Sequence, residues 1–388
     1  MTEISLLIVI IIAILIAIRL IKNNRTEDGY NRGTDNYDRG SSNYNKGTDK
    51  VKLPKYKKKP ISLFGKEEKK SFRSSFSEFF SSPLPFDEEA ISWCTNLLAI
   101  DKSELKAILR HIKGQYKVFN IRKRSGGYRT ISAPSIRLLA IQKTIYHCIL
   151  LPVNLHPAAT GFRKDISITH NARPHLGKDE VLKTDIIDFF DSIHQYTVVN
   201  AFKKIGYPSN ISKLLAELCC LRKRLPQGAP TSPALSNIIA YEMDKKLIYL
   251  SAEYDLTYTR YADDLTFSGN NIPYHAVLSK ITEIIKSEGF ALKISKNRHI
   301  DKNRRKIITG ISISSGKKLT IPKAKKREIR KNVYFILTRG LVEHQKHIGS
   351  HDPSYLKRLL GYLSFWHSVE PENKYVTDSI SALKKLRY

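Results

Sequence analysis

The sequence predicts an α+β body whose central sheet is antiparallel, preceded by an apolar N-terminal segment and a polar linker. The first residues form one long apolar run, and the stretch after it is rich in Gly, Asn and Lys. From Trp93 onward, short apolar runs bounded by turn residues recur in a mixed helix and strand pattern. At 388 residues the chain exceeds one average domain, so we expect several lobes.

The chain is strongly basic. It carries 66 Lys and Arg against 36 Asp and Glu, a formal net charge of +30. Such an excess indicates an anionic partner, either nucleic acid or an anionic membrane surface. The alternative is a protein that is merely basic, and charge alone identifies no activity.

The cysteines predict neither a zinc site nor a disulfide framework. All four stand in apolar stretches, and no pair has the CxxC spacing of a metal site. A reducing cytosol fits this pattern. The four residues are Cys94, Cys148, Cys219 and Cys220.

Residues 1–22 are predicted to form a transmembrane anchor. Positions 4–18 carry no charge, and the apolar run resumes after Arg19, which gives enough helix to cross about 30 Å of hydrocarbon at about 1.5 Å per residue. A cleavable signal would open with basic residues, whereas this segment opens with Glu3 and ends in Lys22 and Arg25. The basic flank predicts a single-pass protein of the inner cell membrane, with its catalytic body in the cytoplasm.

Residues 23–82 are predicted to be a flexible basic linker. Tyr30, Tyr37 and Tyr44 each begin a short polar repeat that ends in glycine, and these repeats lack the aliphatic seam of a coiled coil. A cluster of lysines at 55–59 follows. This cluster could meet lipid headgroups or nucleic acid, or it could simply be solvated.

Two acidic segments predict the chemistry. Asp185 follows a short apolar run, although an isolated Asp there is more often a helix cap or a turn residue. Strand-like runs on both sides of Asp263 and Asp264 place this adjacent pair at a hairpin tip. Because adjacent carboxylates repel, a divalent cation is the expected compensation, and two-metal phosphoryl transfer needs this arrangement. Hard oxygen ligands favour two Mg²⁺ ions.

The segment YADD at 261–264 resembles the YxDD motif of reverse transcriptases, and Asp185 falls where that family keeps its other metal ligand. The segment LPQGAPTSPALSN at 225–237 resembles the family's PQGxxxSP element beside the nascent base pair, and residues 289–297 and 307–313 resemble later palm motifs. A proline-rich turn capped by Ser236 and Asn237 is the alternative interpretation of the first of these. The resemblance implies a right-hand polymerase with fingers at 83–180, an interleaved palm at 181–315 and a thumb at 316–388.

The same resemblance implies a nucleotide site. Lys123 and Arg129 lie on a predicted fingers hairpin where the family holds the incoming triphosphate, although each could be a solvated charge. Gln227 belongs to the element beside the nascent base pair. Phe190, five positions after Asp185, aligns with the aromatic residue that excludes a 2′-hydroxyl, which implies a preference for dNTPs. The alternative places the Phe190 ring in the core.

Two further segments resemble bacterial retron reverse transcriptases. Asn171 and His175 match the NAxxH element, and Thr309 and Gly310 match the VTG element with Ile308 in place of Val. A helix cap for Asn171 and a turn glycine for Gly310 are the alternatives. The resemblance implies RNA binding at these four residues.

A basic helix after Pro322 fits a thumb that follows the phosphates of a duplex. Residues 355–366 would supply the apolar packing of the same lobe. The cations predicted to bind RNA are Lys325, Lys326, Arg327 and Arg330.

Membership of the retron group would imply a cognate noncoding RNA as template and primer, a single-stranded DNA product linked to that RNA, and an antiphage role with an effector protein. Two alternatives stay open. A group II intron-like reverse transcriptase would be expected to carry a maturase or endonuclease extension. A membrane-bound RNA-binding protein with an inactive palm is disfavoured by the intact aspartates.

Overall fold

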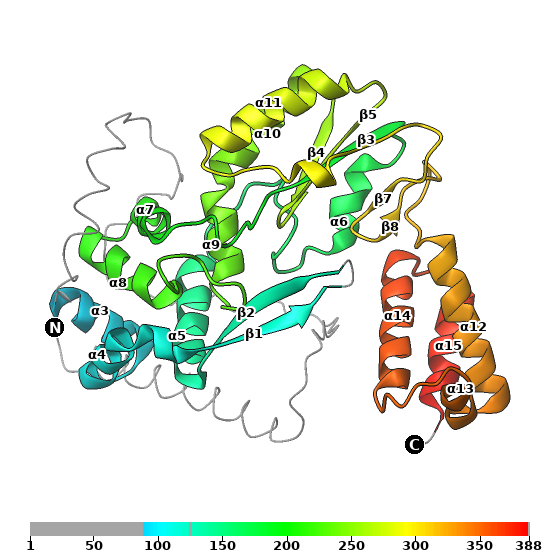
Figure 1. The fold of residues 1–388 in the computed structure, drawn as a ribbon, viewed down its shortest axis with the longest axis horizontal. Coiled ribbons are helices and arrows are strands. Elements are labelled where there is room, and N and C mark those ends of the chain that lie inside the picture. Colours follow the sequence, from blue (N-terminus) through cyan, green and yellow to red (C-terminus); the bar gives the residue numbers. More distant parts are fainter. Residues whose placement is uncertain (1–87, 124–125, 387–388) are drawn as a thin grey trace, which may run out of the picture.

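The computed structural model describes residues 88–123 and 126–386 (Figure 1). The predicted anchor at 1–22 and the predicted linker at 23–82 lie outside these residues. Within the described ranges, every helix is too short or too polar to span a bilayer.

A four-stranded sheet of order β4-β5-β3-β6 lies at the centre of the described fold. All of its neighbouring strands run antiparallel, which confirms the predicted antiparallel sheet. Helix α10 packs against strand β4, and α11 packs against α10 (Figure 1). The strands are β3 (Glu180–Asp185), β4 (Thr257–Tyr261), β5 (Asp264–Gly269) and β6 (Arg298–Ile300). The helices that accompany the sheet are α7 (Gln195–Ile205), α8 (Ser209–Cys219), α9 (Ser232–Ile239), α10 (Tyr241–Glu253), α11 (Tyr274–Ser287) and η4 (Ile294–Lys296).

The N-terminal part of the described chain combines helices with one long hairpin. Strands β1 and β2 pair antiparallel over their full length, as the apolar run before Gly126 and Gly127 predicts. Both of these glycines adopt positive φ, which the hairpin turn requires. The elements are α3 (Glu88–Leu98), α4 (Lys102–Arg110), η1 (Ile112–Gln115), β1 (Tyr116–Arg122), β2 (Tyr128–Pro134), α5 (Ile136–Ile145), η2 (Tyr146–Leu150), α6 (Ile168–Ala172) and η3 (Arg173–His175).

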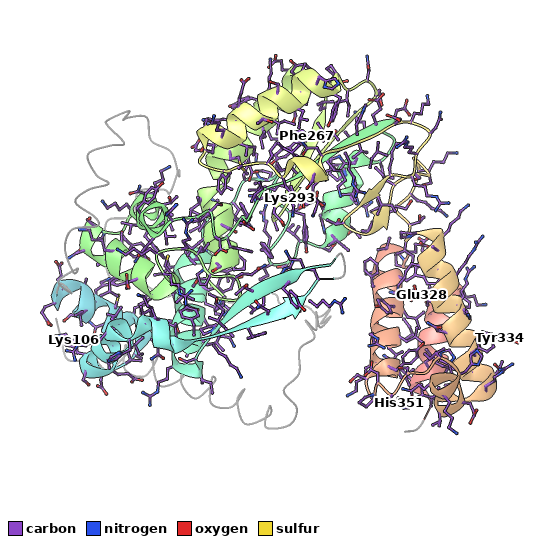
Figure 2. The ribbon with its side chains drawn as sticks, in the orientation of Figure 1. Lys106, Phe267, Lys293, Glu328, Tyr334 and His351 are labelled. Atoms are coloured by element: carbon purple, nitrogen blue, oxygen red, sulfur yellow. The ribbon has the colours of Figure 1, made fainter. Side chains whose placement is uncertain are left out.

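The C-terminal helices form a separate bundle at the right of Figure 1. Helix α14 buries Leu356, Leu359, Leu363 and Trp366 at helical spacing, which confirms that this segment supplies the apolar packing. On α12, Tyr334 points away from the rest of the molecule (Figure 2) and is 62% exposed. The elements are β7 (Ile307–Ile308), β8 (Ile311–Ser312), α12 (Lys323–Arg339), α13 (Leu341–His347), α14 (Tyr355–Val369) and α15 (Lys374–Lys384).

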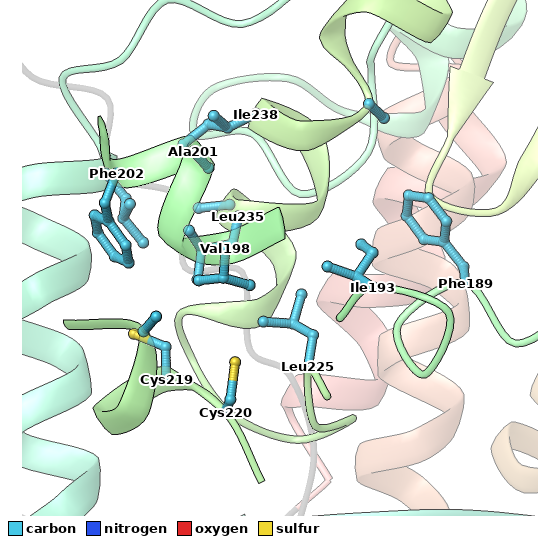
Figure 3. Packing of buried hydrophobic residues seen from close by; sticks show 14 of the residues in the cluster. Phe189, Ile193, Val198, Ala201, Phe202, Cys219, Cys220, Leu225, Leu235 and Ile238 are labelled. Carbon is cyan, nitrogen blue, oxygen red and sulfur yellow. The ribbon is translucent and has the colours of Figure 1, made fainter. Parts of the chain in front are cut away.

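Two buried apolar clusters hold these parts together. The larger one lies beneath the N-terminal helices and the central sheet, where Val198 and Phe202 of α7 gather with Leu235 of α9 (Figure 3). The second joins the C-terminal helices to the β7–β8 hairpin and to Val181 of β3. The bundle is therefore attached through apolar contacts with the sheet as well as through the chain.

The four cysteines are free thiols that differ in exposure. Cys94, Cys219 and Cys220 are buried, but Cys148 is exposed. Cys148 lies in the π-helical turn η2.

We predict that His175 makes the fold sensitive to acid. Burial lowers the pKa of this imidazole to about 3, helped by the charges of Lys183 and Lys178, from an ordinary value of 6.5. Between these two pKa values the unfolded state therefore binds a proton at His175, whereas the folded state does not. The stabilisation is complete above the unfolded pKa and is lost as the pH falls toward the folded pKa, by at most about 1.4 kcal/mol per pH unit.

The measurement is the urea dependence of unfolding between about pH 7 and about pH 4. His175→Gln keeps a donor and an acceptor but does not titrate, so its free energy of unfolding should fall less steeply with acid than that of the wild type. His351→Gln, at an exposed position, serves as the control and should keep the wild-type slope. Equal slopes for His175→Gln and the wild type would contradict the prediction.

Candidate active site

The three predicted aspartates meet where β3 ends and the β4–β5 turn begins. Asp185 is the register partner of Asp264, and the backbone N–H of Ile186 donates to the Asp263 carbonyl at 2.9 Å. Ala262 holds a positive φ of 59°, which tightens the turn and leaves Asp263 and Asp264 next to the end of β3. The structure therefore confirms the predicted hairpin and places the three aspartates at the same end of the sheet.

Burial disfavours the negative charge of the carboxylates at this turn. Burial is the largest cause of the raised pKa of Asp263, which a backbone hydrogen bond opposes and the charge of Asp185 increases. Burial likewise raises the pKa of Asp264, against the nearby charge of Lys183. Lys183 Nζ lies 3.1 Å from Asp264 Oδ2, and Lys296 Nζ pairs with Asp185 Oδ2.

The carboxylates fit a divalent cation. Oδ1 of Asp264 is buried without a hydrogen-bond partner, a costly arrangement that a cation would relieve. Oxygen donors alone, as here, are the ligands that Mg²⁺ prefers. Over the described ranges, no three His, Cys, Asp or Glu side chains already converge on one point. Instead, Asp264 is paired with Lys183 and Asp185 with Lys296.

A buried ion pair supports the acidic turn. Arg260 and Asp244 are both fully buried, and Arg260 donates from Nε and Nη2 to the two Asp244 oxygens at 2.8 and 2.6 Å. Its Nη1 donates to the Ala262 carbonyl at 3.1 Å and to Asn237 Oδ1 at 3.0 Å. The Tyr258 hydroxyl donates to Asp244 at 2.8 Å. The guanidinium therefore ties the backbone of the turn to α9 and α10.

The loop at 158–162 lies directly against the same turn. Backbone hydrogen bonds of 2.7 and 2.8 Å join this loop to Arg260 in both directions. The Gly161 carbonyl accepts a hydrogen bond from Asn237 Nδ2 at 2.8 Å, so Asn237 does not act as the helix cap of the alternative interpretation. A Cβ on Gly161 would lie 2.7 Å from the Ala262 nitrogen, so the close approach requires glycine.

The hairpin brings one of its two predicted phosphate-binding residues to the aspartates. Arg129 of β2 lies near enough to Asp263 to lower the pKa of that carboxyl. Lys123 is exposed at the end of β1, and its backbone N–H donates to the Gly127 carbonyl at 2.9 Å. The positive charge of Arg129 thus partly offsets the burial that raises the pKa of Asp263.

The predicted base-pair element is attached to the same hairpin. The Gln227 carbonyl accepts a hydrogen bond from the Ser132 N–H of β2 at 2.8 Å, and the Gln227 side chain is half-buried. Gly228 has a φ of 123°, and a Cβ there would lie 2.9 Å from the Ser132 carbonyl oxygen. Glycine is therefore needed where the loop crosses β2. The predicted loop and the helix after it are confirmed.

The NAxxH residues are buried inside the protein. Asn171 Oδ1 accepts a hydrogen bond from Thr160 at 2.8 Å, and its Nδ2 donates to Thr309 Oγ1 at 3.3 Å. The two nitrogens of His175 lie 2.7 and 2.8 Å from the hydroxyls of Ser268 and Thr259. Asn171 is 1% exposed and His175 is fully buried, so neither side chain is available to RNA here. This corrects the expectation of direct contact, because the motif joins the sheet to neighbouring loops.

The VTG-like segment forms the predicted strand and turn. Thr309 and Gly310 lie between β7 and β8 and hold φ values of 44° and 83°. Gly310 is exposed and Thr309 is half-buried. The hydrogen bond from Asn171 to Thr309 therefore connects the two segments that resemble retron motifs, leaving the exposed turn backbone open for contact.

The predicted RNA-binding cations of α12 differ in what they contact. Lys326 Nζ lies 2.7 Å from Glu370 Oε1, and the Arg330 guanidinium lies 5.5 Å from the Trp366 ring centroid. Lys325 Nζ stands 3.7 Å over an aromatic ring of α14. Lys325 and Lys326 are half-buried, whereas Arg327 and Arg330 are exposed.

Comparison with known proteins decides the family. A model of the reverse transcriptase (RNA-dependent DNA polymerase) family matches residues 121–313. The retron Ec86 reverse transcriptase of Escherichia coli is 32% identical over 291 residues, covering 74% of this chain and 87% of that protein. The chain belongs to the retron reverse transcriptases. It is therefore an RNA-directed DNA polymerase with an RNA template as partner.

Two further retron relatives agree. The retron Ec83 reverse transcriptase of Escherichia coli is 30% identical over 290 residues, 70% of this chain and 90% of that protein. The retron Mx162 reverse transcriptase of Myxococcus xanthus is 32% identical over 285 residues, 66% of this chain and 58% of that protein. These matches confirm the predicted enzyme class and the retron resemblance.

Sequence reasoning missed the residues that support this polymerase site. Arg260 directly precedes the YADD segment and received no role, Asn237 was named only as a possible cap, and Asp244 lies on a helix that carried no prediction. The available signal was a lone Arg inside a predicted strand, where a charge that is buried needs a partner. Gly161 gave no signal, because only the folded chain shows what approaches it.

We predict that Arg260→Met destabilises the protein by about 3–5 kcal/mol, because Asp244 would keep a buried charge without its partner. The measurement is the free energy of unfolding in urea. Lys280→Met breaks the exposed pair with Glu253, whose N–O distance of 2.5 Å is similar, and should leave the free energy within experimental error. A similar effect of both substitutions would contradict a special role for burial.

Proposed function

We propose that this reverse transcriptase copies a cognate noncoding RNA into single-stranded DNA that stays linked to the RNA, in a retron system that defends against phage. The observation that carries this proposal is the position of Asp185, Asp263 and Asp264 at one end of the sheet, near a basic hairpin, in a chain of the retron family. An effector protein of the same system would act together with the RNA-linked DNA product.

The three aspartates are proposed as the ligands of two Mg²⁺ ions. When bound, these ions would lower the pKa of the primer hydroxyl and stabilise the leaving pyrophosphate. Arg129 neutralises triphosphate charge from the hairpin, and the Arg260 pair keeps the acidic turn in place. Lys296, already paired with Asp185, is close enough to exchange that partner for a phosphate oxygen.

The Phe190 ring is proposed to select the sugar. It is half-buried, five positions beyond Asp185, and its centroid lies 5.7 Å from that of Phe189. A bulky ring at this place leaves no room for a 2′-hydroxyl on the incoming nucleotide. Gln227, fixed to β2 through its carbonyl, would pack beside the nascent base pair.

We predict that Asp263→Ala combined with Asp264→Ala abolishes dNTP incorporation while RNA binding survives. The carboxylates supply the metal ligands, whereas RNA affinity depends mainly on basic side chains. Primer extension with Mg²⁺ and filter binding of RNA measure the two properties. Asp378→Ala removes an exposed carboxylate on α15 and should retain full synthesis. Synthesis by the double variant would refute the catalytic assignment.

We predict that one structured RNA, joined to DNA, copurifies with the full chain. Retron synthesis would yield a single RNA species whose attached DNA is sensitive to DNase and whose linkage survives denaturing gels. Sequencing of the copurified nucleic acid identifies the RNA and any DNA attached to it. The catalytically inactive double variant is the control. A heterogeneous mixture of cellular RNAs without attached DNA would point to another class of reverse transcriptase.

We propose that residues 1–22 anchor the enzyme in the inner membrane with its catalytic body in the cytoplasm. The uncharged run at 4–18 and its basic flank support this. We predict that the full chain pellets with carbonate-washed membranes, while a chain in which three leucines or isoleucines of this run are changed to Asp does not. A full chain that stays in the carbonate supernatant would rule the anchor out.

A further inference from the structure

Phe162 is an aromatic residue whose position hydrophobic burial does not explain. It is 38% exposed and belongs to neither of the two buried clusters of the described chain. Its φ of 59° is a left-handed conformation that costs a residue with a Cβ about 1–2 kcal/mol. Residues held in strained backbone conformations cluster at functional sites, and Phe162 combines such strain with an exposed ring.

The backbone around Phe162 is fixed on both sides. Gly161 packs against the Ala262 nitrogen with no room for a side chain, and its carbonyl accepts the Asn237 hydrogen bond. On the other side, Arg163 Nη1 donates to the Ala159 carbonyl at 3.2 Å, which closes the loop on itself. The strain at Phe162 is therefore imposed by its neighbours, and the ring is carried at a constant place beside the acidic turn.

The Phe162 ring contacts two rings of the active site. Its centroid lies 5.9 Å from that of Phe190 and 6.4 Å from that of Tyr261, both within the range of favourable aromatic pairs. Tyr261 directly precedes the acidic turn. Phe162 is thus the shared neighbour of the proposed sugar-selecting ring and the first residue of the YADD segment.

The other neighbour of Phe190 is rigid. Phe189 is 4% exposed, its ring lies 5.6 Å from that of Phe290, and the Arg260 guanidinium lies 5.7 Å from its centroid. Phe190 therefore contacts one buried ring, Phe189, and one more exposed ring, Phe162. If Phe162 were removed, the Phe190 ring would lose one of these contacts and could move into the space that Phe162 had filled.

We propose that Phe162 is a specificity-determining residue that holds the Phe190 ring in place and so sets how strongly ribonucleotides are rejected. The proposal rests on the proposed role of Phe190 as the ring that excludes a 2′-hydroxyl. Phe162 acts on the sugar through Phe190, so it is a positioning residue. Its loss relaxes selection without removing any group that the chemistry uses.

The test is single-nucleotide incorporation by the full chain on an RNA template annealed to a DNA primer, comparing dGTP with GTP. Phe162→Ala should lower the ratio of kcat/KM for dGTP to that for GTP by about three- to tenfold, the range that one aromatic pair allows. The change should come from better use of GTP. Phe162→Tyr keeps the ring and should keep the wild-type ratio, while Tyr249→Ala, an exposed aromatic on α10, is the matched control.

Parallel variants separate the two levels of the proposal. If Phe190→Ala loses discrimination and Phe162→Ala does not, Phe162 has no role and the inference is overturned. If Phe190→Ala keeps discrimination, the sugar-selecting role of Phe190 itself fails. If Phe162→Ala lowers kcat/KM equally for both nucleotides, the ring is a general support, which also overturns the inference.

The double variant gives a final check. When Phe162 acts only through Phe190, adding Phe162→Ala to Phe190→Ala should change the ratio no further. Additive losses would mean that Phe162 contacts the nucleotide independently and would overturn the proposed route. Phe162→Leu, a smaller change at the same exposed site, gives the same comparison should the Ala variant fold poorly.

Discussion

Arg260 carries a positive charge at a place with no exposed surface, and Asp244 is the carboxylate that makes this possible. Removing either ion from water alone would cost several kcal/mol, so the two must be buried together and with good geometry. The Nη1 group that Asp244 does not use reaches the Ala262 carbonyl and Asn237. The buried pair therefore also fixes the backbone position of the turn that carries Asp263 and Asp264.

The same turn is held from its other side by a close backbone approach. Gly161 has no side chain, so the loop at 158–162 can lie against the Ala262 nitrogen and exchange hydrogen bonds with Arg260. Positive φ values at Ala262 and Phe162 mark the two places where the backbone is bent to achieve this contact. The positions of the three carboxylates and of the aromatic rings beside them thus depend on one shared scaffold, which would link the proposed selection of the sugar to the proposed catalytic site.

Local patterns in the sequence were sufficient for the elements that carry the site. The alternating runs around Asp263 and Asp264 predicted the hairpin, because a period of two needs no tertiary information. The role of Arg260 could not be predicted that way, since a strand pattern does not say which helix supplies a buried partner. The motif identified Asn171 and His175 as a pair, but a motif records which residues occur together and not whether they face solvent or the interior.

The C-terminal bundle shows how basic side chains divide between packing and binding. Lys326 is half-buried and paired with Glu370, so a phosphate can engage it only by weakening that ion pair. Arg327 and Arg330 are both exposed, although Arg330 also lies over the Trp366 ring. Phosphate contacts release counterions only where a cation is available. The RNA-binding surface of α12 should therefore be sought along its exposed side, where Arg327 and Tyr334 combine charge with an aromatic ring.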